Sequence, residues 1–437
     1  MTALPPLDAA FVMKIGANVS GGSSTHEQNR DTKKCIRSLM RIEDKALTEG
    51  TTRAVKSERI LVIGGGPAGA ALAIQLVRQG RRVTLVEKTA TCHDKVCGEF
   101  LSGESAGYLD ILGINIDKLG ALPIKKVRVA TKKIIAEQPL PFSSWSLRRS
   151  LLDEALLQQA AREGADVFRG RCVETLFCDA TGWAAKLNDG HYLHSSDVFL
   201  ATGKHDLRGW QRDAGKQSDL IAFKMHFALT PSEENLLGEC IELAFFKGGY
   251  AGLQLLEPGR ANLSLLLTKK ALHKCGSQWE QVLGYITSLS RHLARRLTNA
   301  NSLQSRPLAL SAIPYGFQRL QSASGLWAIG DQATVIPSFT GDGVAIALHS
   351  AFMAAQAYDQ GQTSREFQTD LANQLRGPVQ LATRLSRSLI AMPSLAQTLR
   401  LYPKLLTHIA SATRIPDRFY DSNGISKDAV STKAYAS

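Results

Sequence analysis

The stretch Arg59-Ile-Leu-Val-Ile-Gly64-Gly-Gly66-Pro67-Ala-Gly69 decides the fold of this chain. After Arg59, the run Ile60-Leu-Val-Ile63 has the apolar, largely β-branched character of a short buried strand, and a glycine turn follows it directly. Apolar residues then recur at helical spacing from Pro67 to Gln79, and Gly80 ends that helix. Arg82-Val-Thr-Leu-Val-Glu87 forms a second strand, so the segment predicts a parallel βαβ unit.

The glycines of this turn have the spacing of a dinucleotide-binding loop. Gly64 permits the tight turn, Gly66 lets the backbone approach a pyrophosphate, and Gly69 packs the helix against the strand. The start of the helix adds free N–H groups and a positive dipole end. An acidic residue, Glu87, follows 23 positions after Gly64, where it can accept hydrogen bonds from a ribose. The predicted cofactor ligands here are Gly64, Gly66, Pro67, Ala68, Gly69, Glu87 and the adjacent Lys88.

A second glycine turn indicates which dinucleotide is bound. Ala328-Ile-Gly330-Asp331 has the pattern of a strand that ends at an aspartate, and Gly341-Asp342-Gly343 opens a second helix. That helix end suits the electron-rich edge of an isoalloxazine ring, while Asp331 can hold a ribityl hydroxyl. Two anion-stabilising helix ends, separated by most of the chain, favour FAD over a nicotinamide cofactor.

These elements resemble the FAD-dependent oxidoreductases that include p-hydroxybenzoate hydroxylase, geranylgeranyl reductases and flavin-dependent halogenases. Similarity to the geranylgeranyl reductase branch rests on Val96-Cys-Gly-Glu-Phe-Leu-Ser102, on Arg149-Ser-Leu-Leu-Asp153 and on the second glycine turn. The resemblance spans roughly residues 59–358. It implies an α/β fold with a Rossmann-type FAD-binding domain, an inserted β-sheet substrate domain and a helical C-terminal tail, and it places Arg149 at the cofactor.

The chain divides accordingly. Residues 1–56 are polar and lack periodicity, which predicts a disordered extension, although a start of translation further downstream explains them equally well. The FAD-binding domain is expected at 57–122, 148–217 and 301–360, the substrate domain at 123–147 and 218–300, and the tail at 361–437. Beyond the βαβ unit we expect strands at 127–130, 166–177, 197–201, 221–229, 241–246, 263–267 and 325–329, and helices at 149–164, 278–297 and 342–358.

The sequence departs from the family in two places. Thr202 stands where the hydroxylases carry the Asp of an Asp-Gly pair, so the electron donor stays open between NADPH and a reduced partner protein. The nearby Lys204 and Arg208 can attract an anionic reductant, or, as the simpler interpretation, are solvated. The stretch Tyr250-Ala-Gly-Leu-Gln-Leu-Leu-Glu-Pro258 lacks both tryptophans of the halogenase motif, which argues against halogenation and also removes one mark of the reductases.

Cys97, Glu99 and Tyr250 are the candidate catalytic residues. The matching motif of the reductases lies close to the flavin, so the Cys97 thiol can donate a proton, and burial can keep Glu99 partly protonated for the same task. The structural alternatives are packing for Cys97, capping for Glu99 and a plain sheet position for Tyr250. No spacing of His, Cys and Asp predicts a metal site.

Composition limits the classes of partner. A net charge of +13 attracts nucleic acid, anionic lipid or an acidic ligand, but the cations are dispersed and no nucleic-acid-binding motif is present. No run of roughly 18 apolar residues and no signal peptide is found, which predicts a cytoplasmic protein. Its seven dispersed cysteines are expected to be reduced thiols.

The tail carries leucines at near-helical spacing among basic residues, the pattern of an amphipathic helix. Packing of these leucines on the FAD-binding domain is favoured over peripheral membrane contact, and Pro378 and Pro393 are expected to divide the segment into two or three short helices. The residues concerned are Leu371, Leu375, Leu381, Leu385, Leu389, Leu395, Leu399 and Leu405, with Arg376, Arg384, Arg387, Arg400 and Lys404.

The leading hypothesis is an FAD-dependent oxidoreductase that transfers hydride from reduced flavin to a C=C bond of a hydrophobic substrate, such as a polyprenyl, lipid or polyketide chain. The alternative is an FAD-dependent monooxygenase acting on an aromatic or polyketide substrate. A non-enzymatic basic protein that retains FAD is disfavoured, because the second glycine turn is aimed at the reactive ring.

Overall fold

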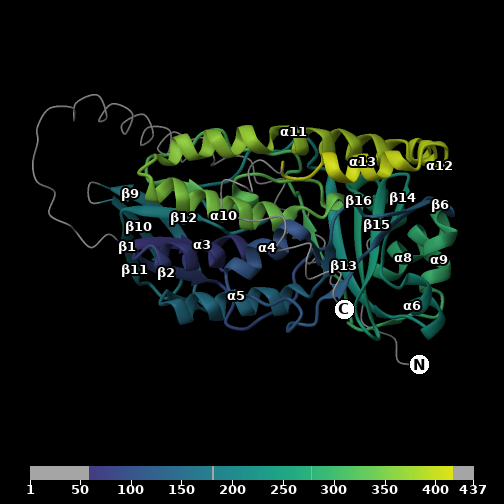
Figure 1. Cartoon of the computed structure of the whole chain (residues 1–437), viewed down its shortest axis with the longest axis horizontal. Helices are drawn as coiled ribbons and strands as arrows, with labels where there is room; N and C mark the ends of the chain where they lie inside the picture. The colour runs from purple at the N-terminus through teal and green to yellow at the C-terminus, as the bar shows by residue number, and fades with distance from the viewer. Residues whose placement is uncertain (1–58, 180–181, 277, 417–437) are drawn as a thin grey trace, which may run out of the picture.

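The computed structural model describes residues 59–179, 182–276 and 278–416; the extension predicted at 1–56 lies outside them. A five-stranded parallel sheet forms one end of the molecule, in the order β19-β12-β1-β2-β8 (Figure 1). Alternate residues of β1 face opposite layers, so both faces of the sheet are covered and the inner part of β1 is an unbroken apolar run. The strands are β1 (Arg59–Ile63), β2 (Arg82–Glu87), β8 (Asp166–Arg169), β12 (Asp197–Leu200) and β19 (Leu326–Ala328).

Helices cover one face of this sheet and a small antiparallel sheet covers the other. On the helical side α3 (Pro67–Arg78) packs against α5 (Arg149–Glu163) and α10 (Gly343–Asp359). On the other side lie β9 (Val173–Asp179), β10 (Gly182–Leu187) and β11 (Tyr192–Ser195). The single strand expected at 166–177 is therefore two strands in different sheets, because Gly170, with a φ of 70°, turns the chain between them.

The second large sheet lies where the sequence predicts the substrate domain, and we call it the substrate sheet. Its order is β17-β13-β16-β15-β14-β5-β6, and β18 also pairs with β13. β18 brings the sheet to Ser311, beyond the boundary expected at residue 300. The strands are β5 (Lys126–Ala130), β6 (Ile134–Pro139), β13 (Leu220–Ala228), β14 (Cys240–Phe246), β15 (Gly249–Glu257), β16 (Arg260–Thr268), β17 (Asn301–Ser302) and β18 (Leu308–Ser311).

Short helices pack on one face of the substrate sheet through Trp279, Val282 and Ile286. They are α6 (Pro231–Leu237), α7 (Lys269–Cys275), α8 (Trp279–Leu289) and α9 (Arg291–Leu297). The helix expected at 278–297 is interrupted at Ser290, whose side chain caps α9 by accepting from the Leu293 N–H. A small sheet of β3 (Phe100–Ser102), β7 (Ser144–Ser146) and β4 (Leu122–Pro123) joins the two domains, because β3 contacts α10 whereas β4 and β7 contact β15. The helix α4 (Gly103–Ile111) and the 3₁₀ turn η2 (Gly330–Gln332) pack against α10, and a second 3₁₀ turn is η3 (Ser338–Thr340).

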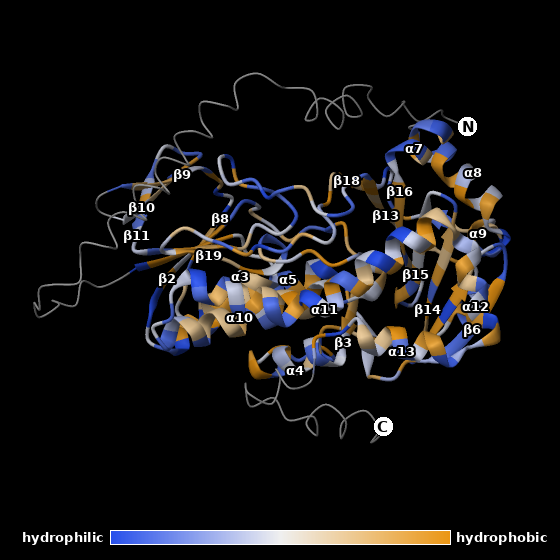
Figure 2. Cartoon of the chain, turned by 90° about the horizontal axis from the view of Figure 1, so that it is seen from above, coloured by the Kyte–Doolittle hydropathy of each residue, from blue (hydrophilic) through white to orange (hydrophobic). Residues whose placement is uncertain are grey.

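The tail runs along both domains as α11 (Ser364–Ala391), η4 (Pro393–Gln397), α12 (Thr398–Leu401) and α13 (Lys404–Ala412). Polar and apolar residues alternate along α11, as Figure 2 shows, and its apolar side is buried. The expected division at Pro378 is wrong, because α11 continues through this residue. Pro378 is buried, and so are Leu375 before it and Val379 and Ala382 after it, so packing of α11 on the rest of the protein holds the helix together on either side of the proline. Pro393 does follow the end of the helix.

Within the described residues, none of the helices combines the length and the apolar character that crossing a bilayer requires.

Candidate active site

The first glycine turn has the shape that a pyrophosphate needs. Gly64 has a φ of 109°, and a Cβ there would lie 2.4 Å from the Ala201 carbonyl oxygen. A Cβ on Gly69 would lie 1.9 Å from the Gly64 carbonyl oxygen, so both positions require glycine. Gly66 differs, because a Cβ there would have Arg149 Nη2, at 4.0 Å, as its nearest neighbour. The open space beside Gly66, at the N-terminus of α3, therefore suits a pyrophosphate group.

Glu87 lies at the end of β2 beside this turn. Its Oε2 accepts from the Gly65 N–H at 2.8 Å, and its Oε1 accepts from the Thr89 hydroxyl at 2.7 Å. Burial alone would raise the pKa of Glu87, but the hydrogen bonds from Thr89 and Gly65 and the charge of Lys95 lower it below the ordinary value. The ionised carboxylate also lines the cavity described below, where it can accept from ribose hydroxyls.

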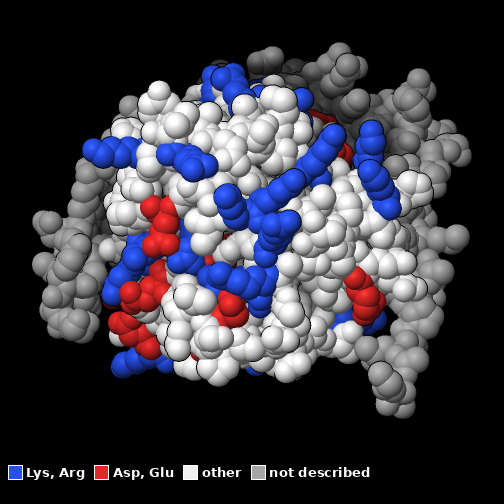
Figure 3. Space-filling view, turned by 90° about the vertical axis from the view of Figure 1, so that its right-hand side faces the viewer, with Lys and Arg blue, Asp and Glu red and all other residues white. Residues whose placement is uncertain are grey.

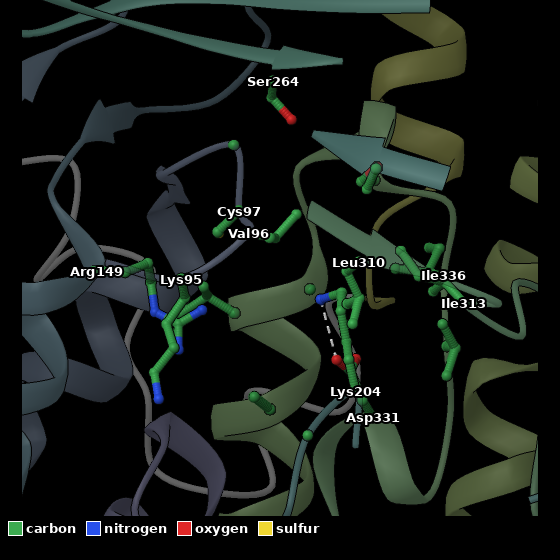
Figure 4. A pocket seen from close by; sticks show the side chains of 18 of the residues that line it. Lys95, Val96, Cys97, Arg149, Lys204, Ser264, Leu310, Ile313, Asp331 and Ile336 are labelled. Atoms are coloured by element: carbon green, nitrogen blue, oxygen red, sulfur yellow. Dashed lines mark hydrogen bonds and ion pairs between the residues drawn. The ribbon is translucent and has the colours of Figure 1, made fainter. Parts of the chain in front are cut away.

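Cationic side chains surround the space next to the turn. Arg149 is held by Asp153 through two hydrogen bonds of 2.9 Å, Nε to Oδ1 and Nη2 to Oδ2. The carboxylate of Asp153 and the sulfur of Cys97 raise the pKa of Arg149 despite its burial, so its charge is fixed. Figure 4 shows Arg149 and Lys95 close together near Cys97. These cations complement the two negative charges of a pyrophosphate.

Across the cavity lies the second cofactor turn. Asp331 Oδ2 forms an ion pair of 3.1 Å with Lys204 Nζ, drawn as a dashed line in Figure 4, and the Asp331 carbonyl accepts from Arg212 at 2.7 Å. Gly341 and Gly343 line the cavity through their backbone, as a flavin-binding turn requires.

The Asp342 carboxylate points away from the cavity and lies 3.1 Å from Arg414 Nη2. Arg414 also pairs with Glu104 and stacks 4.0 Å from the centre of the Phe142 ring. Burial raises the pKa of Asp342 to about 7, although the Arg414 charge opposes this rise. Asp342 thus connects the second glycine turn to the tail and does not itself line the cavity.

Cys97 and Glu99 lie on a loop that crosses from the FAD-binding domain to the substrate sheet. Asn262 Nδ2 donates to the carbonyl oxygens of Cys97 (3.1 Å) and Gly98 (2.9 Å), and Gln254 Nε2 donates to that of Glu99 at 3.0 Å. Glu99 has a φ of 61°, a left-handed conformation that is strained for a residue with a side chain. The substrate sheet therefore fixes this loop by three hydrogen bonds to its backbone.

The Glu99 side chain is fully buried among donors. Its Oε1 lies 2.7 Å from Lys224 Nζ and 2.9 Å from the Arg149 N–H, and its Oε2 lies 3.1 Å from His226 Nε2. Burial would raise the pKa of Glu99, but the bonds from His226 and Lys224 outweigh burial and lower it. The expectation that burial keeps Glu99 partly protonated is therefore wrong: these partners favour the carboxylate.

Sequence reasoning missed Lys224, His226, Gln254 and Asn262. Their signal was a polar side chain within an otherwise apolar strand, on β13, β15 and β16. Asp94, Glu99 and His226 also bring potential metal-ligand atoms within 4.8 Å of one another, which no spacing in the sequence revealed. The ammonium group of Lys224, 2.7 Å from Glu99 and 3.8 Å from Asp94, already supplies the positive charge there.

Tyr250 lies inside the cavity on β15. Its hydroxyl is 2.8 Å from Ser338 Oγ, which is also 3.0 Å from the Tyr315 hydroxyl. Burial raises the pKa of Tyr250 well above its ordinary value, so this phenol stays protonated. The three hydroxyl groups connect the substrate sheet to η3, just before the flavin turn.

One cavity of about 810 Å³ joins the residues expected at the site. Its polar end lies at the first glycine turn, and its other end is walled by apolar residues of the substrate sheet and the tail, among them Val129, Leu266 and Leu399. Of the predicted residues, Gly69 and Asp342 lie beside this cavity, whereas Gly64, Gly66, Pro67, Ala68, Glu87, Lys88, Cys97, Glu99, Arg149, Tyr250, Asp331, Gly341 and Gly343 line it.

Comparisons with known proteins agree with this geometry. Residues 58–197 match the family model of an FAD binding domain. The chain is 25% identical over 322 residues to a menaquinone reductase of Mycolicibacterium smegmatis, which covers 69% of this chain and 76% of the relative. It is 26% identical over 330 residues to a digeranylgeranylglycerophospholipid reductase of Thermoplasma volcanium, and the alignment covers 70% of this chain and 79% of that relative.

Among solved structures, the flavin-dependent brominase Bmp2 superposes with a TM-score of 0.69 at 20% identity, over 86% of this chain and 99% of the brominase chain. This likeness concerns the fold. With the FAD binding domain match, the two reductase relatives and the cavity between the two glycine turns, it leads to one conclusion: the chain is an FAD-dependent oxidoreductase, similar in sequence to menaquinone and digeranylgeranylglycerophospholipid reductases.

Proposed function

We propose that the enzyme reduces a C=C bond in a hydrophobic, chain-bearing substrate such as a polyprenyl compound. The observation that carries this proposal is the continuity of the cavity. It leads from the cofactor cradle, which is formed by the two glycine turns with Glu87, Arg149 and Asp331, into an apolar chamber walled by residues such as Val129, Leu266 and Leu399. A long hydrocarbon chain can occupy such a chamber with most of its surface removed from water. Both reductase relatives are named for substrates that carry isoprenoid chains, which supports the same substrate class.

Bound FAD, once reduced, supplies the hydride for this reaction. The protein holds the cofactor through Gly66, Glu87 and Asp331, and its apolar wall orients the substrate chain and excludes water. The second carbon of the double bond needs a proton, and the Cys97 thiol and the Tyr250 hydroxyl are the candidate donors that line the cavity.

Glu99 has a different role in this proposal. Because Lys224 and His226 keep it ionised, it positions the Cys97–Glu99 loop and the start of α5 by accepting from the Arg149 N–H. Its strained backbone is consistent with a loop held in one functional conformation.

The electron donor is NADPH or a reduced partner protein. Thr202 lines the cavity at the position where the hydroxylases carry aspartate, and its hydroxyl donates to the His205 carbonyl at 2.6 Å. We therefore favour a partner protein over rapid direct reduction by NADPH.

A monooxygenase is the second candidate, because the same residues would hold FAD and the apolar chamber would also shelter an oxygen-transfer reaction from water. Product analysis under air and under nitrogen separates the two. We expect products with two added hydrogens under both conditions. Incorporation of one oxygen atom, with no turnover under nitrogen, would replace the reductase proposal by the monooxygenase.

A further inference from the structure

Within the described part of the tail, residues 392–405 expose apolar side chains to solvent. Met392, Leu395, Leu401, Tyr402 and Leu405 are five of the fourteen large apolar residues that are exposed in the described chain, and they fall within one short stretch. Leu401 and Tyr402 are the most exposed of the fourteen, at 75% and 68%. Such a cluster on η4, α12 and α13 is characteristic of an interaction surface.

The opposite side of the same elements faces the cavity. Ala396, Leu399 and Leu406 are buried and line the apolar chamber, and Ile409 lines it as well. Neighbouring residues therefore point in opposite directions: Leu406 faces the cavity, whereas Leu405 faces solvent. A single layer of short helices separates the substrate chamber from the exposed apolar surface.

Positive charge surrounds this surface. Residues 371–416 contain no Asp or Glu but six Arg or Lys residues. Arg384, Arg387, Arg400 and Lys404 are exposed, and none of them forms an ion pair with another described residue. Figure 3 views this end of the molecule: Lys and Arg are spread over the whole face, whereas most Asp and Glu lie in its lower half, away from the side where α12 lies.

We propose that η4, α12 and α13 dock this enzyme on an anionic membrane surface, with Leu401 and Tyr402 inserted among the lipids. Apolar burial and attraction of cations to acidic headgroups act together in such docking. A second copy of this chain, with its net charge of +13, would cover the apolar side chains but would bring further positive charge against the carboxylate-free stretch 371–416. The membrane also holds chain-bearing substrates, so docking places the chamber next to its substrate pool; this last step rests on the proposed function.

Binding to vesicles tests the proposal directly. We expect the full-length FAD-loaded protein to cosediment at low salt with vesicles of phosphatidylcholine and phosphatidylglycerol, and much less with phosphatidylcholine alone or at high salt. The pair Leu401→Asn with Tyr402→Ser, and separately the pair Arg400→Gln with Lys404→Gln, should each weaken binding at least about tenfold. These side chains are exposed, so the FAD spectrum of the variants should be unchanged.

Matched control pairs lie at the opposite end of the molecule, on the FAD-binding domain. Phe177→Ser with Tyr192→Ser removes two other exposed large apolar side chains, and Arg82→Gln with Arg162→Gln removes two exposed cations. Both control pairs should bind vesicles like the natural protein. Equal loss in control and docking variants, or no binding of the natural protein at low salt, would overturn the proposal.

Two further readouts separate the possible failures. Sedimentation velocity without lipid should show the same oligomeric state for the natural protein and for Leu401→Asn with Tyr402→Ser. If the natural protein is a dimer that does not bind vesicles, and the variant is a monomer, the surface belongs to a contact with a second copy instead.

Turnover of a short, water-soluble alkene should survive in all docking variants. Vesicle binding without such turnover would refute the proposed reduction and leave docking intact.

Discussion

At the scale of single residues, Gly66 is the position where the structure leaves room for a cofactor rather than for protein. Its neighbours Gly64 and Gly69 are glycines because protein backbone lies against them, whereas the space beside Gly66 opens toward Arg149. This difference separates residues needed for folding from one needed for binding.

We therefore expect Gly66→Val to lose most of its FAD while keeping its fold, because the new side chain fills the pyrophosphate space. Asp331→Ala should weaken FAD binding by about 1–3 kcal/mol through loss of a charge-assisted hydrogen bond. Titration of the apoproteins with FAD measures both effects. Gly284→Val, on an exposed helical position with open space around it, is the control and should bind FAD normally. Normal FAD affinity in Gly66→Val would refute the assigned site.

The buried ion pair of Lys224 and Glu99 is a second residue-scale feature. We expect Lys224→Met to lower the free energy of unfolding by about 3–5 kcal/mol, since it leaves the Glu99 carboxylate charged, buried and short of a partner. Adding Glu99→Gln should recover much of that loss. Urea unfolding measures the change, with Lys125→Met as control: Lys125 and Glu239 form an exposed pair that contributes at most about 1 kcal/mol. Equal losses at Lys224 and Lys125 would contradict this interpretation of the network.

The sequence allowed the cofactor residues to be predicted because they form local motifs: Gly64, Gly66 and Glu87 lie within one βαβ unit of known geometry. It did not reveal the Glu99 network, because Glu99 and His226 are 127 positions apart and meet only when the substrate sheet packs on the loop. The same contact explains why the prediction of a partly protonated Glu99 is wrong. The sequence indicates that Glu99 is buried, but not that Lys224 and His226 lie beside its carboxylate.

At the scale of elements, the tail is joined to the flavin turn by the pair of Arg414 and Asp342. The pKa of Asp342 is raised from 3.8 to about 7 in the folded protein, so the folded state retains a proton that the unfolded chain releases. The stabilisation from the protonated form is complete below about pH 4 and is lost as the pH rises toward 7. Between pH 5 and 7, Asp342 should therefore contribute a decline of up to about 1.4 kcal/mol per pH unit.

Asp342→Asn should remove that decline, because an amide does not titrate. Urea unfolding of the FAD-loaded protein at several pH values between 5 and 8 measures this decline in the free energy of unfolding. The contributions of other titrating groups cancel when the values of the variant are subtracted from those of the natural protein. Arg414→Gln should move the titration to still higher pH, since its positive charge opposes the rise. Parallel pH profiles for the natural protein and Asp342→Asn would show that the carboxyl does not titrate in this range.

Secondary structure elements were predictable where a periodic pattern was long and bounded by turn residues, as for α3, α5 and α10. Three outcomes depended on packing instead. β18 joined the substrate sheet because β13 offered it a free edge, Gly170 divided an expected strand, and α11 continued through Pro378 because its apolar side is held along its length.

At the scale of the whole molecule, three parts meet around one cavity: the two glycine turns, the substrate sheet and the tail. The tail had been expected to pack on the FAD-binding domain. The structure shows that it does so through Leu371 and Leu375 and that, further along, Leu399 and Leu406 wall the substrate chamber. Sequence patterns identified the leucines but not which of them face the substrate.

The central claim is that reduced flavin in this cavity passes its electrons to a C=C bond without oxygen. The most direct measurement is an anaerobic single turnover: the FAD-loaded enzyme is reduced with dithionite, mixed with a polyprenyl substrate, and followed by flavin absorbance. We expect the oxidised flavin spectrum to return, with one double bond reduced per flavin reoxidised. The claim would be contradicted if the flavin stayed reduced until oxygen was admitted and an oxygenated product then formed.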